Sequence, residues 1–273
     1  MPTRLYHLTA DGLILPLASP AETLDAQSAT LPDGIYTTFR TYGGPFVLGL
    51  DRHLYRLVES HQILDDDRPL DLTVIRAGVR AALADANLPD VKVRITTPFG
   101  QPDLYIGLEP LTPWPADFYE NGVLCRTSTL ERDNPQAKYT AFIAPSRAEK
   151  AAADPTVHEF IRLNPDGYLL EGFSSNFFAL KNGQLHTADE GVLAGVTRSI
   201  VLTLAEQADL TVVYTPIHQS DLPTLTEAFI TSASREVMPI RQLDDVILGP
   251  PGPVARALLA RYRAYLTTHT DAI

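Results

Sequence analysis

Lys138 is the residue of this sequence best suited to covalent chemistry. It follows the loop segment Pro135-Gln-Ala at the point where the chain turns helical. An ε-amine in such a place is partly desolvated, which prepares it for imine formation. The other three lysines have structural explanations: Lys92 lies in a short strand, Lys150 ends a helical run, and Lys181 begins a hairpin turn. A solvated lysine at the start of a helix is the alternative interpretation of Lys138.

A lone carboxylate follows Lys138 in the chain. Glu171 ends a predicted strand and precedes the small polar loop Gly172-Phe-Ser-Ser. A carboxylate at this place can pair with a protonated pyridine nitrogen and so make the ring a better electron sink. A glutamate that stabilises a turn is the alternative.

A candidate anion site comes next. Gly195-Val196-Thr197 opens a helix, whose free N–H groups and dipole attract negative charge, although every helix start shares this property. Arg56 is a second candidate, but an arginine on an amphipathic helix is usually solvated. An amine, a carboxylate and a phosphate-sized helix start are what a pyridoxal phosphate enzyme requires.

The hydrophobic pattern predicts an α+β protein in two parts, with helices layered on mixed sheets. Residues 111–121 contain two prolines and no clear period, so they are interpreted as a linker. It separates a small N-terminal α/β domain, residues 1–110, from a large cofactor-binding domain, residues 122–273. We also expect Ile35–Tyr42 to form a hairpin with Phe46–Leu48, and Asp51 to cap the next helix. The other expected strands are 4–7, 13–17, 91–97, 104–108, 122–127, 168–171, 176–180 and 184–187, and the helices 72–86, 139–153, 197–208 and 253–267.

Composition excludes several classes of function. The net charge of −11 argues against nucleic-acid binding, and no apolar run approaches the roughly 20 residues that span a bilayer. The seven histidines lack ligand-like spacing, so no metal site is predicted. The single cysteine, Cys125, excludes an intrachain disulfide and fits a reducing cytoplasm, where we expect the protein to reside.

Five sequence blocks, in order, resemble the class IV family of pyridoxal phosphate-dependent aminotransferases, which includes branched-chain and D-amino acid aminotransferases and aminodeoxychorismate lyase. The resemblance extends from about Gly34 to Pro239. The blocks are Tyr36-Thr-Thr-Phe-Arg with Arg52-His-Leu-Tyr-Arg56-Leu, Gln136-Ala-Lys138, Glu171-Gly-Phe-Ser-Ser-Asn-Phe-Phe, Leu193-Ala-Gly-Val-Thr-Arg-Ser, and Glu227-Ala-Phe-Ile-Thr-Ser-Ala-Ser-Arg-Glu-Val-Met-Pro-Ile.

The resemblance implies fold-type IV, with the cofactor site between the two domains, and assigns residue roles. Lys138 would form the Schiff base with pyridoxal 5'-phosphate and act as general base, and Glu171 would pair with the pyridine nitrogen. Phosphate and loop contacts are implied for Arg56, Ser174, Ser175, Val196, Thr197, Ser232 and Ala233.

The sequence departs from the family's pattern at several positions, among them Ile143, where branched-chain enzymes carry a cofactor-binding tyrosine. Ala233 stands where relatives usually carry threonine, so Ser232 or Ser234 must supply any hydroxyl contact. The first loop, Thr30-Leu-Pro-Asp-Gly-Ile-Tyr, lacks the fuller glycine pattern of the family. These departures weaken any transfer of substrate specificity.

The substrate carboxylate requires a cation or hydrogen-bond donors. Arg94 is the leading candidate, with an outward-facing strand arginine as the alternative, while Tyr36 and Arg40 alternate on the preceding strand and can share a face. The resemblance further implies a homodimer in which a loop, here Pro98–Asp103, reaches the partner's active site.

Three functions stay open. The first is a transaminase that moves an amino group between an amino acid or primary amine and a 2-oxo acid. The second is 4-amino-4-deoxychorismate lyase, which uses the same lysine and cofactor to eliminate pyruvate. The third is a non-catalytic protein that keeps the fold as a binding module.

Overall fold

The computed structural model describes residues 2–273, which form two compact units. Unit 1 comprises the chain up to Thr112 together with residues 137–144 and 268–273, and unit 2 comprises residues 113–136 and 145–267. The chain first passes from unit 1 to unit 2 after Thr112, inside the predicted linker. It then returns to unit 1 twice, so the two units are not two continuous halves of the sequence. The eight residues around Lys138 join unit 1 because they pair with its strand edge, and the C-terminus joins it through a strand of its own.

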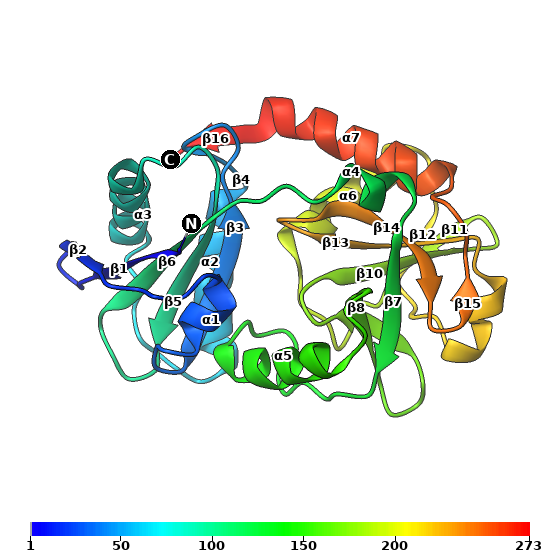
Figure 1. The fold of residues 1–273 in the computed structure, drawn as a ribbon, viewed down its shortest axis with the longest axis horizontal. Coiled ribbons are helices and arrows are strands. Elements are labelled where there is room, and N and C mark those ends of the chain that lie inside the picture. The colour runs from blue at the N-terminus through cyan, green and yellow to red at the C-terminus, as the bar shows by residue number, and fades with distance from the viewer. Residues whose placement is uncertain (1) are drawn as a thin grey trace. The chain divides into compact units, whose positions relative to one another are not determined.

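Unit 1 is built on a five-stranded antiparallel sheet (Figure 1). Its order is β2-β1-β6-β5-β3, which leaves β3 at one edge. The strands are β1 (Arg4–Leu8), β2 (Ile14–Leu17), β3 (Gly34–Arg40), β5 (Val91–Pro98) and β6 (Leu104–Pro110); the helices are α1 (Leu24–Ser28), α2 (Leu50–Ile63), α3 (Leu72–Ala86) and the 3-10 turn η1 (Thr140–Phe142).

The apolar faces of α2 and α3 bury one side of this sheet. Leu54 and Leu57 of α2 and Val79 of α3 pack with sheet residues such as Val93 and Ile106. This burial supplies the hydrophobic stabilisation of the unit, because each side chain leaves water almost completely. The side chains of β3 and β5 that alternate with these core residues point to the opposite side, where α1 lies against β6.

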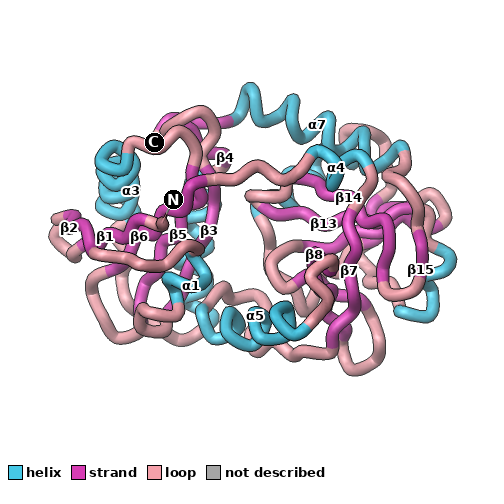
Figure 2. Tube along the Cα trace, in the orientation of Figure 1, coloured by secondary structure: helices cyan, strands magenta, loops and turns pink. Residues whose placement is uncertain are grey.

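Unit 2 contains a nine-stranded sheet in which six strands close into a ring. The order is β12-β11-β10-β13-β14-β7-β8-β9, and β9 pairs with β10 to complete the ring. The core lies within the barrel and includes Cys125, Ile161, Phe177 and Met238. Burial raises the pKa of the Cys125 thiol, as expected for a structural cysteine. The tube in Figure 2 shows these strands in magenta.

The elements of unit 2 follow the chain order β7 to α7. The strands are β7 (Val123–Ser128), β8 (Val157–Leu163), β9 (Leu169–Gly172), β10 (Asn176–Lys181), β11 (Gln184–His186), β12 (Val212–Val213), β13 (Glu227–Ser232), β14 (Glu236–Leu243) and β15 (Val246–Ile247). The helices are α4 (Ala116–Glu120), α5 (Ile143–Ala152), α6 (Val196–Glu206), the 3-10 helix η2 (Gln219–Thr224) and α7 (Pro253–His269); α5 begins with two residues of unit 1 and α7 ends with two. Among residues 2–273 no helix is long and apolar enough to span a bilayer.

The structure corrects three local predictions. The hairpin expected between Ile35–Tyr42 and β4 (Phe46–Leu48) is present only near its turn, where Thr41 forms an isolated bridge with Val47 and the Tyr42 N–H group donates to the Phe46 carbonyl (2.8 Å). The strand that pairs with β4 is β16 (Thr270–Ala272). The residue at the N-cap of α2 is Gly49, in a left-handed conformation, and Asp51 lies inside the first turn. The segment between the strands expected at 13–17 and 35–42, for which no helix is predicted, contains the short helix α1.

Candidate active site

The predicted site residues belong to both units. Unit 1 carries Tyr36, Arg40, Arg56, Arg94 and Lys138. Unit 2 carries Glu171, Ser174, Ser175, Val196, Thr197, Ser232 and Ala233. Each unit holds its share of these residues through contacts of its own.

Lys138 lies along the free edge of β3. Its carbonyl oxygen accepts a hydrogen bond from the Tyr36 N–H group (2.8 Å), and its own N–H group donates to the buried Ser60 Oγ (3.1 Å). Tyr139 and Ile35 form the adjacent bridge. The Lys138 Nζ atom lies 4.7 Å from the centre of the Tyr36 ring. The backbone of the lysine is therefore fixed on both sides, and its amine is placed over an aromatic ring.

Arg56 lies on α2, where this helix packs against β3, and contacts the face of β3 opposite to the one that carries Tyr36. Its side chain is 7% exposed, and Nη2 donates to Thr37 Oγ1 (2.8 Å) and to His53 Nδ1 (3.3 Å). Burial and the neighbouring charges of Arg56 and Lys138 hold the pKa of His53 well below its ordinary value. His53 is therefore neutral and can accept the guanidinium hydrogen bond. The result is a buried cation in a fixed orientation.

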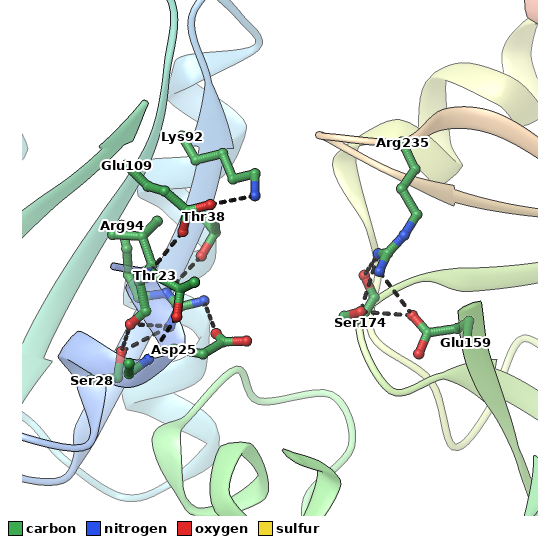
Figure 3. A network of polar contacts seen from close by, with 12 residues as sticks. Thr23, Asp25, Ser28, Thr38, Lys92, Arg94, Glu109, Glu159, Ser174 and Arg235 are labelled. Carbon is green, nitrogen blue, oxygen red and sulfur yellow. Dashed lines mark hydrogen bonds and ion pairs between the residues drawn. The ribbon is translucent and has the colours of Figure 1, made fainter. Parts of the chain in front are cut away.

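Arg94 is bound by α1. Its Nη2 atom pairs with Asp25 Oδ1 (2.8 Å), and Nη1 donates to Ser28 Oγ (2.8 Å) and to the Leu24 carbonyl (3.1 Å). Nε donates to Thr38 Oγ1 (3.1 Å), as Figure 3 shows. Arg94 thus connects β3, β5 and α1.

Tyr36 and Arg40 share a face of β3, as their alternation predicts. The Arg94 guanidinium carbon lies 4.7 Å from the centre of the Tyr36 ring, so Arg94 belongs to the same face. Arg40 lies further along the strand, with its guanidinium carbon 4.4 Å from the Tyr42 ring centre and Nε donating to the Thr41 carbonyl (3.3 Å).

Glu171 lies where β9 meets β10 and closes the ring of strands. Its carboxylate is 2% exposed and is surrounded by donors. Oε1 pairs with Arg132 Nη1 (3.0 Å) and lies 3.6 Å from Arg162 Nη2. Oε2 accepts from Asn176 Nδ2 (3.2 Å) and from the Leu193 N–H group (3.0 Å). These contacts fix the carboxylate and compensate its buried charge.

The start of α6 is attached to the same group of residues. Asn176 donates to the Leu193 carbonyl (2.8 Å), and a Cβ atom on Gly195 would overlap the Asn176 side chain. Gly195 is the N-cap and provides no side-chain hydrogen bond to the first turn, which holds the buried Val196 and Thr197. The first N–H groups of an α-helix have no partner within the helix, so an uncapped start can receive an anion.

A second buried carboxylate, which the sequence interpretation missed, organises the polar loop after β9. Glu159 is fully buried, and its Oε2 accepts from the hydroxyls of Ser174 (2.7 Å) and Ser175 (3.2 Å). Its Oε1 pairs with Lys150 Nζ (2.6 Å), and Oε2 lies 3.5 Å from Arg235 Nη2. Both serine hydroxyls thus point to Glu159. Their predicted contact with a cofactor stays a prediction.

Arg235 connects this loop to the turn after β13. Its Nη1 atom donates to Ser174 Oγ (3.1 Å), which Figure 3 shows beside Glu159, and its backbone N–H donates to Ser232 Oγ (3.2 Å). Nε donates to His158 Nε2 (3.0 Å). Because Ser232 accepts this bond, its hydroxyl proton can still be donated to another group. The turn that holds Ser232 and Ala233 is thereby attached to the loop that follows Glu171.

Sequence and structure comparisons identify the family. A model of the family described as amino-transferase class IV matches residues 34–243. The chain belongs to the class IV aminotransferases. The branched-chain-amino-acid aminotransferase of Pseudomonas aeruginosa is 28% identical to it over 263 residues, which cover 88% of this chain and 86% of the relative.

Solved structures share the fold of this class IV aminotransferase. The branched-chain aminotransferase of Thermoproteus uzoniensis, crystallised with norvaline, has a TM-score of 0.81 and 22% identity over 96% of this chain and 94% of that one. A fold IV-transaminase of Curtobacterium pusillum has a TM-score of 0.77 and 25% identity over 97% and 99% of the two chains. The predicted α+β fold of type IV is confirmed.

Class IV aminotransferases depend on pyridoxal phosphate, and the residues of this chain fit that cofactor. The uncapped start of α6 suits a phosphate, the buried Glu171 carboxylate suits a ring N–H group, and Lys138 supplies a primary amine. Within residues 2–273 no group of three metal-ligating side chains is found.

Replacing Glu159 tests its role in the fold of this aminotransferase. Glu159→Gln leaves Lys150 and Arg235 without their buried counter-charge, so we expect the free energy of unfolding to fall by about 3 kcal/mol. Urea unfolding measures the loss. The control is Asp245→Asn, which removes the exposed pair with Arg126. Equal stability of the two variants would contradict the structural role of Glu159.

His158 predicts a pH dependence of stability. Burial and the charge of Arg235 lower the pKa of His158 from 6.5 to about 3. Below pH 6.5 the unfolded chain therefore binds a proton that the folded protein does not, and the free energy of unfolding falls with pH. The pKa of Glu159 falls from 4.5 to about 2, so stability from this carboxylate is lost only below pH 4.5.

The variant His158→Gln keeps an acceptor for Arg235 but does not titrate. Between pH 6.5 and 4.5 we expect the free energy of unfolding of the variant to decline less steeply than that of the wild type. The difference between the two slopes should be roughly 1 kcal/mol per pH unit. Urea unfolding at several pH values gives the slopes, with the exposed His269→Gln as control. Parallel curves for the wild type and His158→Gln would show that His158 is not the source.

Proposed function

We propose that this class IV aminotransferase is a transaminase that moves an amino group between an amino acid, or a primary amine, and a 2-oxo acid. The observation that carries the proposal is the placement of Lys138, whose backbone is fixed by Tyr36 and Ser60 and whose amine lies over the Tyr36 ring. A lysine that only solvated a helix start would not need either constraint. The name of the Pseudomonas aeruginosa relative supports an amino acid as donor.

Each group of residues has a proposed task. Pyridoxal phosphate, when bound, supplies an electron sink for negative charge at the carbon that bears the amine. Lys138 holds the cofactor covalently and, once displaced by the donor's amine, accepts the proton from the donor's Cα. The Glu171 carboxylate would accept a hydrogen bond from the N–H group of the pyridine ring. Its contacts with Arg132 and Asn176 keep it oriented for this role.

The family resemblance assigns several anion-binding groups of this chain to the cofactor's phosphate. The N–H groups of Val196 and Thr197 offer donors at the start of α6, and the buried Arg56 supplies a positive charge. Ser232 contributes its hydroxyl proton, and Ala233 contributes backbone alone. The fixed orientation of Arg56 by Thr37 supports its assignment, because an oriented guanidinium binds phosphate with little loss of entropy.

The predicted contact of Arg94 with a substrate carboxylate is not part of this proposal. Four of its five N–H donors already have acceptors in unit 1, which fits a role in holding α1. The half-buried Tyr36 and Arg40 stay the proposed substrate contacts on β3. A cytoplasmic location rests on the single cysteine alone.

We further propose a homodimer. Phe99 lies in the segment predicted to reach the partner and is 40% exposed, and Leu13, Leu15 and Leu17 form an exposed apolar run. Light scattering of the purified protein should give twice the chain mass of 29.9 kDa. A single-chain mass at micromolar concentration would contradict the dimer.

Covalent trapping tests the role of Lys138. After addition of pyridoxal phosphate and borohydride reduction, peptide mass spectrometry should find the cofactor on Lys138 and on none of the other three lysines. Lys138→Ala should lose the visible band of the covalently bound cofactor, and its turnover should fall by roughly 1,000-fold or more, because both the nucleophile and the base are absent.

Lys181→Ala is the control, since it removes a lysine whose amine pairs with Asp221 near the surface. Turnover of Lys138→Ala at the wild-type level would overturn the proposed function. Release of pyruvate from aminodeoxychorismate without an amino acceptor would assign the lyase reaction instead. A protein that takes up no pyridoxal phosphate would support the binding-module alternative.

A further inference from the structure

The Tyr36 ring connects the covalent lysine to Arg94. The Lys138 Nζ atom and the Arg94 guanidinium carbon each lie 4.7 Å from the centre of this ring. The two cationic groups are therefore separated by no more than twice that distance. In a donor such as glutamate, the second carboxylate is four bonds from the amine, or roughly 5 Å. A donor whose amine replaces that of Lys138 can thus bring a second carboxylate to Arg94.

Asp25 already occupies that position. Its Oδ1 atom lies 2.8 Å from Arg94 Nη2, while Nη1 donates to Ser28 Oγ and to the Leu24 carbonyl, and Nε donates to Thr38 Oγ1. The Arg94 side chain is 10% exposed, whereas that of Asp25 is 51% exposed. The Asp25 carboxylate therefore lies on the outer, more exposed side of the ion pair and covers the edge of the guanidinium. Figure 3 shows the pair and the surrounding bonds.

Contacts that do not involve Arg94 hold α1, and with it Asp25, in place. Thr23 Oγ1 caps the helix by accepting from the Ala26 N–H group (3.2 Å), and the Leu24 N–H group donates to Glu109 Oε2 (2.8 Å). Gln27 Nε2 donates to Thr3 Oγ1 (2.8 Å) in the buried space under α1. The backbone of Asp25 is fixed, so a carboxylate that approaches Arg94 meets a like charge that cannot withdraw far.

We propose that Asp25 is a specificity-determining residue that neutralises Arg94 and excludes donors and acceptors with a second carboxylate. The inference rests on the proposed function and names its substrate class: amino acids and 2-oxo acids whose side chains are uncharged. Glutamate and glutamine have nearly the same shape and differ in charge. Wild-type enzyme should therefore favour glutamine over glutamate, in whichever enantiomer reacts.

The test removes the charge and keeps the shape. For Asp25→Asn, the ratio of glutamate to glutamine specificity constants should rise about tenfold, the change expected for one partly exposed ion pair. Spectral titration of the cofactor-loaded enzyme with each donor gives the ratio. The matched control is Ser28→Ala, which removes another α1 contact of Arg94 without changing charge and should leave the ratio within roughly twofold.

A binding measurement separates this inference from the proposed function. Calorimetry with glutarate and with its monoamide needs no turnover, and Asp25→Asn should bind glutarate about tenfold more tightly while binding the monoamide unchanged. If the cofactor-loaded wild type shows no half-reaction with any amine donor but the glutarate shift occurs, the proposed function fails and the role of Asp25 stands. An equal change for glutarate and monoamide, or the same change in Ser28→Ala, would overturn the role of Asp25.

Discussion

The buried carboxylate of Glu171 connects four separate segments of unit 2 through ion pairs and hydrogen bonds. A charge at 2% exposure is unstable unless it is surrounded by donors, and here two guanidinium groups, an amide side chain and a backbone N–H surround it. These donors come from separate parts of the chain: the loop before Lys138, β8, β10 and the segment before α6. The contacts of one carboxylate therefore connect the point where β9 pairs with β10 to the segment before the helix start that suits an anion.

Unit 1 uses a different constraint to place its functional group. β3 is the edge strand of its sheet, and no further strand within residues 2–273 pairs with its outer side. The segment from Ala137 to Ala144 forms hydrogen bonds and a bridge with that side instead. The lysine is thus positioned through its backbone, by Tyr36 and Ser60, and its amine lies over the Tyr36 ring. The Gly34 end of the same strand is tied to this segment as well, because the Gly34 N–H group donates to Thr140 Oγ1 (3.0 Å).

The sequence predicted well those helices and strands whose capping residues and hydrophobic periodicity lie within the element itself. The helix from Leu72 to Ala86 was predicted with the observed bounds, because Asp71 caps its first turn and its apolar face is periodic. The helix α1 also has a local cap, Thr23, but its five residues are too few for a periodic pattern, and Glu109 and Arg94 hold it from distant strands. No short-range pattern can show that Phe46 pairs with Ala272.

The same division applies to the site. Residue type pointed to Lys138, Glu171 and the helix start, and the family resemblance assigned their roles, since each belongs to a contiguous motif. Glu159 belongs to a strand without a motif, and its importance depends on the closed ring that brings it to Ser174. The pairing of Asp25 with Arg94 likewise depends on the tertiary position of α1. Residues whose role depends on a contact with a distant part of the chain, such as Glu159 and Asp25, could therefore not be predicted from the sequence.

The threading of the chain through its two units has a consequence for synthesis on the ribosome. Unit 1 is assembled from three separate pieces, the last of which includes β16 and the buried Ile273. Its first 112 residues emerge early, yet the edge partner of β3 and the partner of β4 emerge later, the second only after the sequence of unit 2 up to Thr267. The N-terminal unit is thus the last to be completed, and an N-terminal fragment cut at Thr112 would expose two unpaired strand edges.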